Sequence, residues 1–225
     1  MLVAGRRVKL AALAAGVALL AGCGVHPGAA AVVGSDEIST SEVDDVAVAV
    51  CSANLASARA SNATLPTLPT RGARQLAMQI LLEGELSRQF GEHEGVSANQ
   101  QQVSQALAQN EQGFAMLPAD QRDDFKNALK QYAEGQLILL EIGKQKLGKD
   151  ASDNDAINEG KRLRDEYVKS LDVQIDPRFG RFENGAFKPG GTSLSVAQSS
   201  TARAGDRAKP ADAFVAGLPS SQQCS

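Results

Sequence analysis

Two short strand patterns stand far apart in this chain, and the residues between them have the spacing of helices. The first pattern covers residues 29–38 and contains a turn at 34–36. In the second, Val173 and Ile175 alternate with polar residues, which is typical of a half-buried strand. A single short strand leaves its backbone groups unsatisfied. We therefore expect the two strands to pair in one small sheet.

The apolar residues between the strands recur at helical spacing. About five helices are expected, beginning near Ser39, Arg71, Ser97, Pro118 and Ser152. Ser39 with Glu42, and Ser97 with Gln100, have the spacing of a capping box. The predicted fold is mainly α, with about five helices and a small sheet built from N-terminal and C-terminal strands and a hairpin at Asn184-Gly185.

The core is expected to consist of small aliphatic residues. Hydrophobic residues make up 43% of the chain, but aromatic residues only 4%, and there is no Trp. The helix from Arg71 to Phe90 has a broad apolar stripe that includes Leu76, and the stripe after Pro118 continues to Leu147. The charged run at residues 161–166 is interpreted as a solvated outer face.

The first residues have the organisation of an export signal. Arg6, Arg7 and Lys9 precede an apolar run over residues 10–20, which is too short to span a bilayer. The run ends in the sequence Leu-Ala-Gly-Cys at residues 20–23. This sequence resembles the lipobox of bacterial lipoproteins.

The lipobox resemblance implies that residues 1–22 are removed, that Cys23 carries a lipid such as palmitate, and that residues 23–29 form a flexible tether. The protein is then expected at the extracytoplasmic face of the cell membrane, held by a lipid anchor. Two alternatives are an ordinary secretory signal with a chance cysteine and an uncleaved helix. Arg6-Arg7 also leaves twin-arginine export open beside the general secretory route.

The charge of the expected mature chain is negative. Removing the signal removes three of the 23 basic residues and none of the 26 acidic ones, which leaves a net charge of −6. Nucleic-acid binding needs a cationic face that meets phosphates. The sequence therefore predicts no nucleic-acid partner.

Candidate catalytic residues are few. The two histidines are His26, in the expected tether, and His93, in a segment that ends a helix; neither has a metal-ligand set around it. The carboxylate pairs have spacings that point apart on a helix: Glu83 and Glu85, Asp123 and Asp124, Asp153 and Asp155. No G-x-S-x-G, P-loop or C-x-x-C sequence is present. We expect no catalytic residue, metal, cofactor or small-molecule ligand.

Two segments of the chain resemble the N-terminal chaperone domain of SurA-type proteins. AAVVGSDEISTSEVDDV, residues 30–46, resembles the strand and helix that open that domain, although Gly34 stands where an Asn is usual. VQIDPRFGRFENGAF, residues 173–187, resembles its closing segment. The resemblance implies a chaperone-like domain over residues 30–196, without the parvulin isomerase domain of some relatives, followed by a tail over residues 197–225.

Two cysteines remain if Cys23 is lipidated. Export places them in an oxidising compartment, and two thiols allow one intramolecular pairing, so we hypothesise a disulfide between Cys51 and Cys224. Two free thiols or an intermolecular bond are the alternatives. Phe214, Val215 and Leu218 are expected to dock the tail on the first helix and bring Cys224 to Cys51.

These expectations favour a non-catalytic lipoprotein that binds unfolded or exported polypeptides, as a holdase or assembly factor. The alternative is an envelope scaffold lipoprotein with one specific protein partner. A solute-binding lipoprotein fits less well, because such proteins are usually larger, two-lobed α/β molecules. The peptide-binding residues cannot be named from the sequence, although apolar residues on the helices over 71–90 and 119–149 are candidates.

Overall fold

The protein folds as a mainly α domain with a small antiparallel sheet, as predicted. The computed structural model describes residues 27–62, 68–189, 198–207 and 210–224. The sheet has the strand order β2-β1-β3, with β1 at Ala29–Val33, β2 at Asp36–Ser39 and β3 at Val173–Ile175. Ala31 lies opposite Ile175 in the register of β1 and β3. The predicted pairing of the N-terminal and C-terminal strands is confirmed.

The strand β2 was not predicted, because residues 36–39 were expected to lead directly into a helix. A two-residue loop, Gly34 and Ser35, instead turns the chain back so that Asp36 pairs with Val33. Gly34 has a φ of 60°, a left-handed conformation that glycine adopts at little cost. Ile38 is the one buried residue of β2, so the strand has almost no apolar alternation for a sequence pattern to detect.

In the residues that the structure describes, five long helices and three short ones make up most of the domain. The long helices are α2 (Thr40–Ala60), α3 (Thr70–Glu94), α4 (Gln100–Gln109), α6 (Arg122–Leu147) and α7 (Asp153–Val168). The short elements are α5 (Glu111–Ala115), α8 (Ser200–Gly205), α9 (Asp212–Ala216) and the 3₁₀ turns η1 (Ala119–Gln121) and η2 (Ser220–Gln222).

Local capping explains where α2 and α7 begin. The Ser39 hydroxyl accepts a hydrogen bond from the Glu42 amide at 3.1 Å, and Ser152 does the same for Asp155 at 3.2 Å. Both caps agree with the sequence analysis. The expected start of the long helix at Pro118 is displaced, because Pro118 opens the η1 turn and α6 begins at Arg122.

The core is built from small aliphatic side chains around α3. Leu81, Leu82 and Leu86 on α3 are at most 2% exposed and pack with Val43 and Val46 of α2. Two residues of the predicted apolar stripes are not buried. Leu76 is 43% exposed although its neighbours Gln75 and Ala77 are buried, so it lies on the outward face of α3. Leu147 is the last residue of α6 and is 50% exposed.

Glycines allow α6 to lie very close to α7. A side chain at Gly143 would meet the backbone oxygen of Ala156, and one at Gly160 would meet that of Leu139. Helices whose contact consists of small residues can approach until their backbones touch. The α6–α7 contact is therefore set by these two positions and tolerates no larger side chain there.

The hairpin predicted at Asn184-Gly185 joins β4 (Arg181–Glu183) to β5 (Ala186–Lys188). Both turn residues have positive φ, 55° and 79°, as a two-residue hairpin loop requires. This hairpin forms a separate two-stranded sheet. Phe182 and Phe187 face the core from it.

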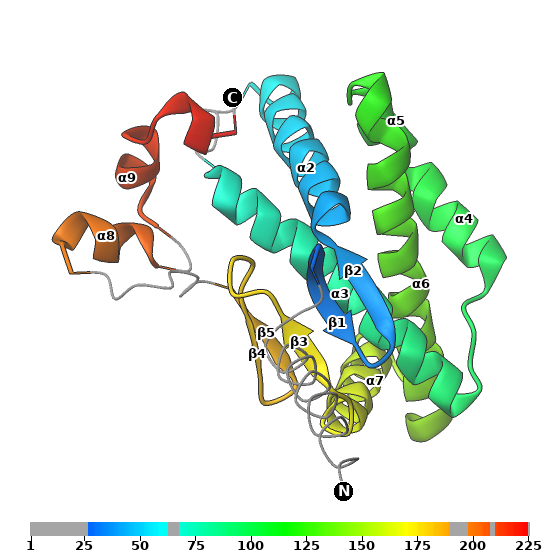
Figure 1. Ribbon diagram of the computed structural model, residues 1–225. Coiled ribbons are helices and arrows are strands. Elements are labelled where there is room, and N and C mark those ends of the chain that lie inside the picture. Colours follow the sequence, from blue (N-terminus) through cyan, green and yellow to red (C-terminus); the bar gives the residue numbers. More distant parts are fainter. Residues whose placement is uncertain (1–26, 63–67, 190–197, 208–209, 225) are drawn as a thin grey trace, which may run out of the picture.

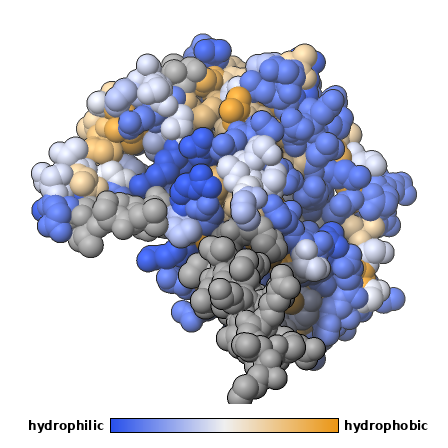
Figure 2. Space-filling model, viewed as in Figure 1, coloured by the Kyte–Doolittle hydropathy of each residue, from blue (hydrophilic) through white to orange (hydrophobic). Residues whose placement is uncertain are grey.

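Figure 1 shows how these elements are arranged. The helices α2, α3 and α6 lie together, the three-stranded sheet crosses one side of them, α4 and α5 lie outside α6, and α8 and α9 stand apart from this group at the left. The face in view is mostly hydrophilic, and apolar residues gather over α2 and near α9 (Figure 2).

Candidate functional site

A groove between α3, α4 and α6 is the best candidate for a binding site. It encloses about 340 Å³. We call it the α3–α6 groove. Its apolar lining consists of Gly84 on α3, Val96 and Ala98 in the segment before α4, and Ile138 on α6; its polar lining consists of Glu85, Arg88, Glu92, Ser97, Gln100, Gln131 and Glu134.

The turn after α3 forms one wall of the groove. Gly95 is left-handed, with a φ of 69°, and the Val96 amide donates to the Gly91 carbonyl at 2.8 Å while the Gly95 amide donates to that of Glu92 at 3.3 Å. This pair of bonds is a Schellman motif, in which the residue after the glycine packs on the helix. Val96 accordingly packs beside Phe90.

The start of α4 differs from the prediction. Asn99, not Ser97, is the cap, and its side-chain oxygen accepts from the amides of Gln101 and Gln102 at 3.0 and 3.3 Å. The Schellman turn and the packing of Val96 and Ala98 on α3 and α6 keep Ser97 in the loop. The helix α4 therefore starts later than the S-x-x-Q spacing indicated. The loop before it, which contains Val96 and Ala98, lines the groove.

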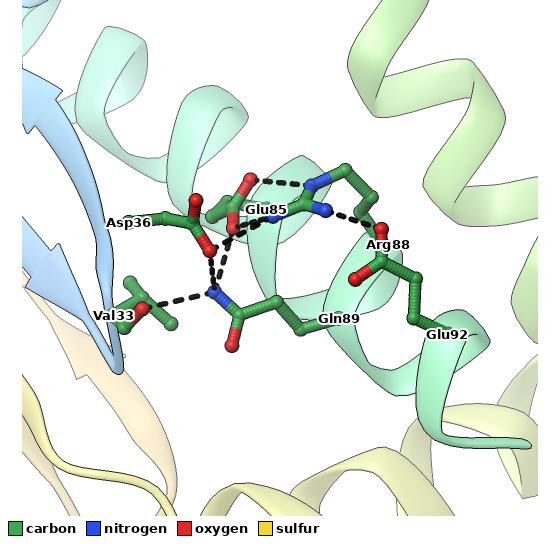
Figure 3. Close-up of polar contacts among 6 residues, drawn as sticks. All are labelled: Val33, Asp36, Glu85, Arg88, Gln89 and Glu92. Atoms are coloured by element: carbon green, nitrogen blue, oxygen red, sulfur yellow. Dashed lines mark hydrogen bonds and ion pairs between the residues drawn. The ribbon is translucent and has the colours of Figure 1, made fainter.

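Arg88 is held by three carboxylates (Figure 3), of which Glu85 and Glu92 line the groove with it and Asp36 lies beside them on β2. Its guanidinium lies 2.6 Å from Glu85, 2.5 Å from Glu92 and 3.0 Å from Asp36 of β2. The hydrogen bond to Glu85 and the surrounding negative charge raise the pKa of Arg88 above its usual range. Gln89 extends the cluster by donating to the Val33 carbonyl and to Asp36, at 2.9 and 3.0 Å.

A second hollow adjoins the groove and shares Gln131 and Glu134 with it. It encloses about 400 Å³ between the start of α2 and α6, and Glu42, Asp45 and Asp124 contribute to its lining. Burial raises the pKa of Glu42, and the charges of Glu85 and Asp124 raise it further, against the lowering effect of a hydrogen bond from the Ser39 backbone. That bond completes the predicted capping box.

The charged run at residues 161–166 is not wholly solvated, which corrects the sequence analysis. Arg164 is 5% exposed and is paired with Glu83 of α3 and, at 2.9 Å, with Asp165. Burial alone would lower the pKa of Arg164, but the two carboxylates outweigh it and raise the pKa. Glu83 is 22% exposed, and its ion pair with the buried Arg164 joins α3 to α7.

The structure joins Cys51 of α2 to Cys224, with 5.1 Å between their Cα atoms, a usual separation for a disulfide. The tail reaches Cys51 with backbone contacts that the sequence analysis did not predict. The Cys224 amide donates to the Leu68 carbonyl at 2.9 Å, and Gln223 bridges to Pro69. The backbone of the tail thus pairs with the segment that precedes α3. Val215 is buried, as expected, and Phe214 and Leu218 are half-buried.

His93 lies on the last turn of α3 and stacks on Tyr167, with ring centroids 4.7 Å apart. Within the described ranges, no group of three or more His, Cys, Asp or Glu side chains is arranged to hold a metal ion. Cys23 and His26 fall outside the described residues, as do residues 1–22.

Among the described residues, no helix combines the length and the apolar character that crossing a membrane requires. Comparison with known proteins adds no relative: no family model, no curated protein and no solved structure matches this chain.

Proposed function

We propose that this protein is a lipid-anchored, extracytoplasmic lipoprotein that binds segments of exported polypeptides without catalysing a reaction on them. The α3–α6 groove is the observation that carries the proposal, because it combines an apolar floor with a hydrogen-bonding rim. Most peptide grooves have this composition: apolar pockets supply affinity and a few polar groups supply orientation. The lipobox and the resemblance to SurA-type chaperone domains support the same function.

The size of the groove sets the expected affinity. A volume of about 340 Å³ accommodates one or two apolar side chains of an extended segment. Burying one Leu or Phe side chain contributes about 1.5–3 kcal/mol, and part of it is offset by the loss of freedom on binding. Weak and reversible binding follows, which suits a holdase that must release its clients.

The test is suppression of aggregation. The mature chain, residues 23–225 with Cys23→Ser so that it stays in solution, is added to several unrelated unfolding proteins whose light scattering is followed. We expect the scattering to fall for most clients. The variant Ala98→Phe fills the groove and should lose the effect.

Two control variants distinguish client binding in the groove from nonspecific hydrophobic binding elsewhere on the surface. Ala98→Ser keeps the groove open and should retain activity. Ala108→Phe adds the same ring at an exposed position of α4, away from the groove lining, and should also retain it. Equal activity of Ala98→Phe and the unmodified chain would exclude the groove as the client site.

Membrane anchoring is tested separately. In a bacterial host that lipidates exported proteins, the full chain should fractionate with membranes and incorporate labelled palmitate. Cys23→Ala should abolish the labelling. Two acyl chains are needed for a stable anchor, so the variant should also appear in the soluble extracytoplasmic fraction if the signal is still cleaved. Labelling that persists in Cys23→Ala would contradict lipidation at this residue.

A single-partner scaffold remains the second candidate because of one surface feature. Val48 of α2 is 52% exposed and borders a hollow of about 200 Å³ that also includes Ala47, Cys51 and Ala73. The lining also includes Asp44, Thr70, Arg74 and Ser221, so the hollow offers one partner apolar and polar contacts together. In-cell crosslinking from position 48 that yields one partner, together with no effect on aggregation, would favour the scaffold.

A further inference from the structure

We propose that the α3–α6 groove selects cationic clients: segments in which an apolar side chain is flanked by Lys or Arg. The proposal deepens the function inferred above and rests on it. The apolar floor alone would accept any hydrophobic segment. Selectivity comes from the charges that surround the floor, and these are unevenly distributed.

The one guanidinium in the groove lining is already occupied. Arg88 is shared by Glu85, Glu92 and Asp36 at 2.5–3.0 Å. Three carboxylates around one cation leave a net charge of −2, and donors that are already bonded to carboxylates are poorly available to an anionic ligand. Arg88 thus orders the rim carboxylates and does not make the rim positive.

Glu134 continues the negative surface from the groove into the neighbouring hollow. Lys130 stands 3.9 Å from it, and the Gln100 amide donates to it at 3.2 Å. The linings of the two hollows together hold six carboxylates, Glu42, Asp45, Glu85, Glu92, Asp124 and Glu134, and two cations, Arg88 and Lys130. The net charge of this lining is −4.

The carboxylates are close enough to repel one another. The pKa of Glu42 is raised by its burial and by the charges of Glu85 on α3 and Asp124 on α6. A cation placed between these helices would relieve that repulsion. A guanidinium or ammonium beside a bound apolar side chain supplies one, since both groups form charge-assisted bonds with carboxylates.

The same charges disfavour the other possible occupants. A second copy of this chain would bring a net charge of −3, or −6 without the signal, toward a negative groove. Nucleic acid and anionic lipid headgroups would be repelled for the same reason. A cationic, apolar polypeptide segment is the partner whose charge and apolar content both match.

The experiment compares three fluorescent peptides that share one Leu-containing core and differ in their flanks, which are Lys, Ser or Glu. Anisotropy is measured with the mature Cys23→Ser chain at 50 and 300 mM salt. We expect affinity in the order Lys, Ser, Glu, with roughly a tenfold ratio between Lys and Glu at 50 mM salt. The ratio should shrink at 300 mM salt, because salt screens exposed charges.

Matched variants assign the preference to the groove. Glu92→Gln with Glu134→Gln removes two groove carboxylates and should lower the Lys-to-Glu affinity ratio several-fold. Glu141→Gln with Glu166→Gln removes two charges from exposed positions of α6 and α7 outside both linings and should leave the ratio unchanged. Circular dichroism confirms that each variant is folded.

The outcomes separate this inference from the proposed function. Equal affinities for the three peptides, abolished together by Ala98→Phe, would overturn the charge selectivity and leave peptide binding in the groove intact. No binding of any peptide would overturn both. Sedimentation that shows a dimer dissociated by Ala98→Phe would replace the client by a second copy of the chain.

Discussion

Removing the bond between Cys51 and Cys224 is expected to destabilise the domain more than any single side-chain substitution in its core. The bond links residues 173 positions apart, so it closes a loop that contains most of the domain. The perturbation is Cys51→Ser with Cys224→Ser in the mature chain that carries Cys23→Ser. Removal of both thiols avoids an unpaired cysteine that would form mixed disulfides.

The magnitude follows from the loop length. In the chain-entropy treatment, a loop of 173 residues stabilises the fold by about 5 kcal/mol at 25 °C. A domain of ordinary stability has about 5–15 kcal/mol in total. Without the bond, the tail keeps the hydrogen bond from Cys224 to Leu68 and the one from Arg71 to the Arg207 carbonyl. Such bonds contribute about 1 kcal/mol each and cannot replace it.

Urea unfolding followed by circular dichroism measures the loss. With a slope of about 2 kcal/mol per molar urea, a loss of about 5 kcal/mol should lower the midpoint by about 2.5 M. Reductant should shift the parent chain to the same midpoint and leave the double variant unmoved. A Cys51→Ser chain that ends at Gln223 should be slightly less stable than the double variant, because it also loses the hydrogen bond from Cys224 to Leu68. If the double variant and the parent differ by less than about 1 kcal/mol, the bond does not constrain the unfolded chain as we argue.

Three further predictions concern the folded state. Glu83→Gln leaves Arg164 buried with its charge partly unpaired and should cost about 3 kcal/mol in urea unfolding, whereas a loss below about 1 kcal/mol would show that Asp165 suffices. Gly143→Leu should cost at least about 3 kcal/mol by forcing α6 from α7, while Gly113→Ala, with nothing within 4 Å of the added atom, should be neutral or stabilising. Folding raises the pKa of Glu42, so the folded protein binds the proton of the Glu42 carboxyl more tightly than the unfolded chain does. The free energy of unfolding of the wild type therefore falls as pH rises through the pKa of Glu42 in the folded protein. Glu42→Gln should therefore be the more stable protein at pH 7, and the difference should vanish below about pH 4; a constant difference from pH 4 to 7 would contradict the shift.

Local signals predicted most of the fold. Ser39 and Ser152 cap their helices with their own neighbours, so a window of four residues contains the whole interaction. The Asn184-Gly185 turn is equally local. The pairing of β1 with β3 is not local, but it follows from the need of two isolated strands for partners, which few alternatives in this chain can meet.

Predictions failed where contacts between helices decide the outcome. Arg164 lies in a charged run, yet it stands four residues after Gly160 and four before Val168, both buried. That spacing places Arg164 on the inward face of α7. The spacing was therefore the sequence signal that could have predicted its burial. Charge alone suggested solvent, because the partner, Glu83, is on another helix. Glycines inside α6 were a second signal, since a helix tolerates them at a cost of about 1 kcal/mol each when close packing requires them.

The groove could not be derived from periodicity, because periodicity predicts which residues are buried and not where a gap remains between two buried faces. Its floor combines Gly84, Val96 and Ile138, which belong to three separate segments. Its width depends on small residues: a side chain at Gly84 would lie 3.2 Å from the Gln131 backbone, and one at Gly135 would lie 2.9 Å from Ser87. These positions bring α3 and α6 together below the groove, while the turn at Gly95 carries the chain past its rim. The groove therefore forms because α3 and α6 approach closely on one side, while the loop between α3 and α4 lies on the other side.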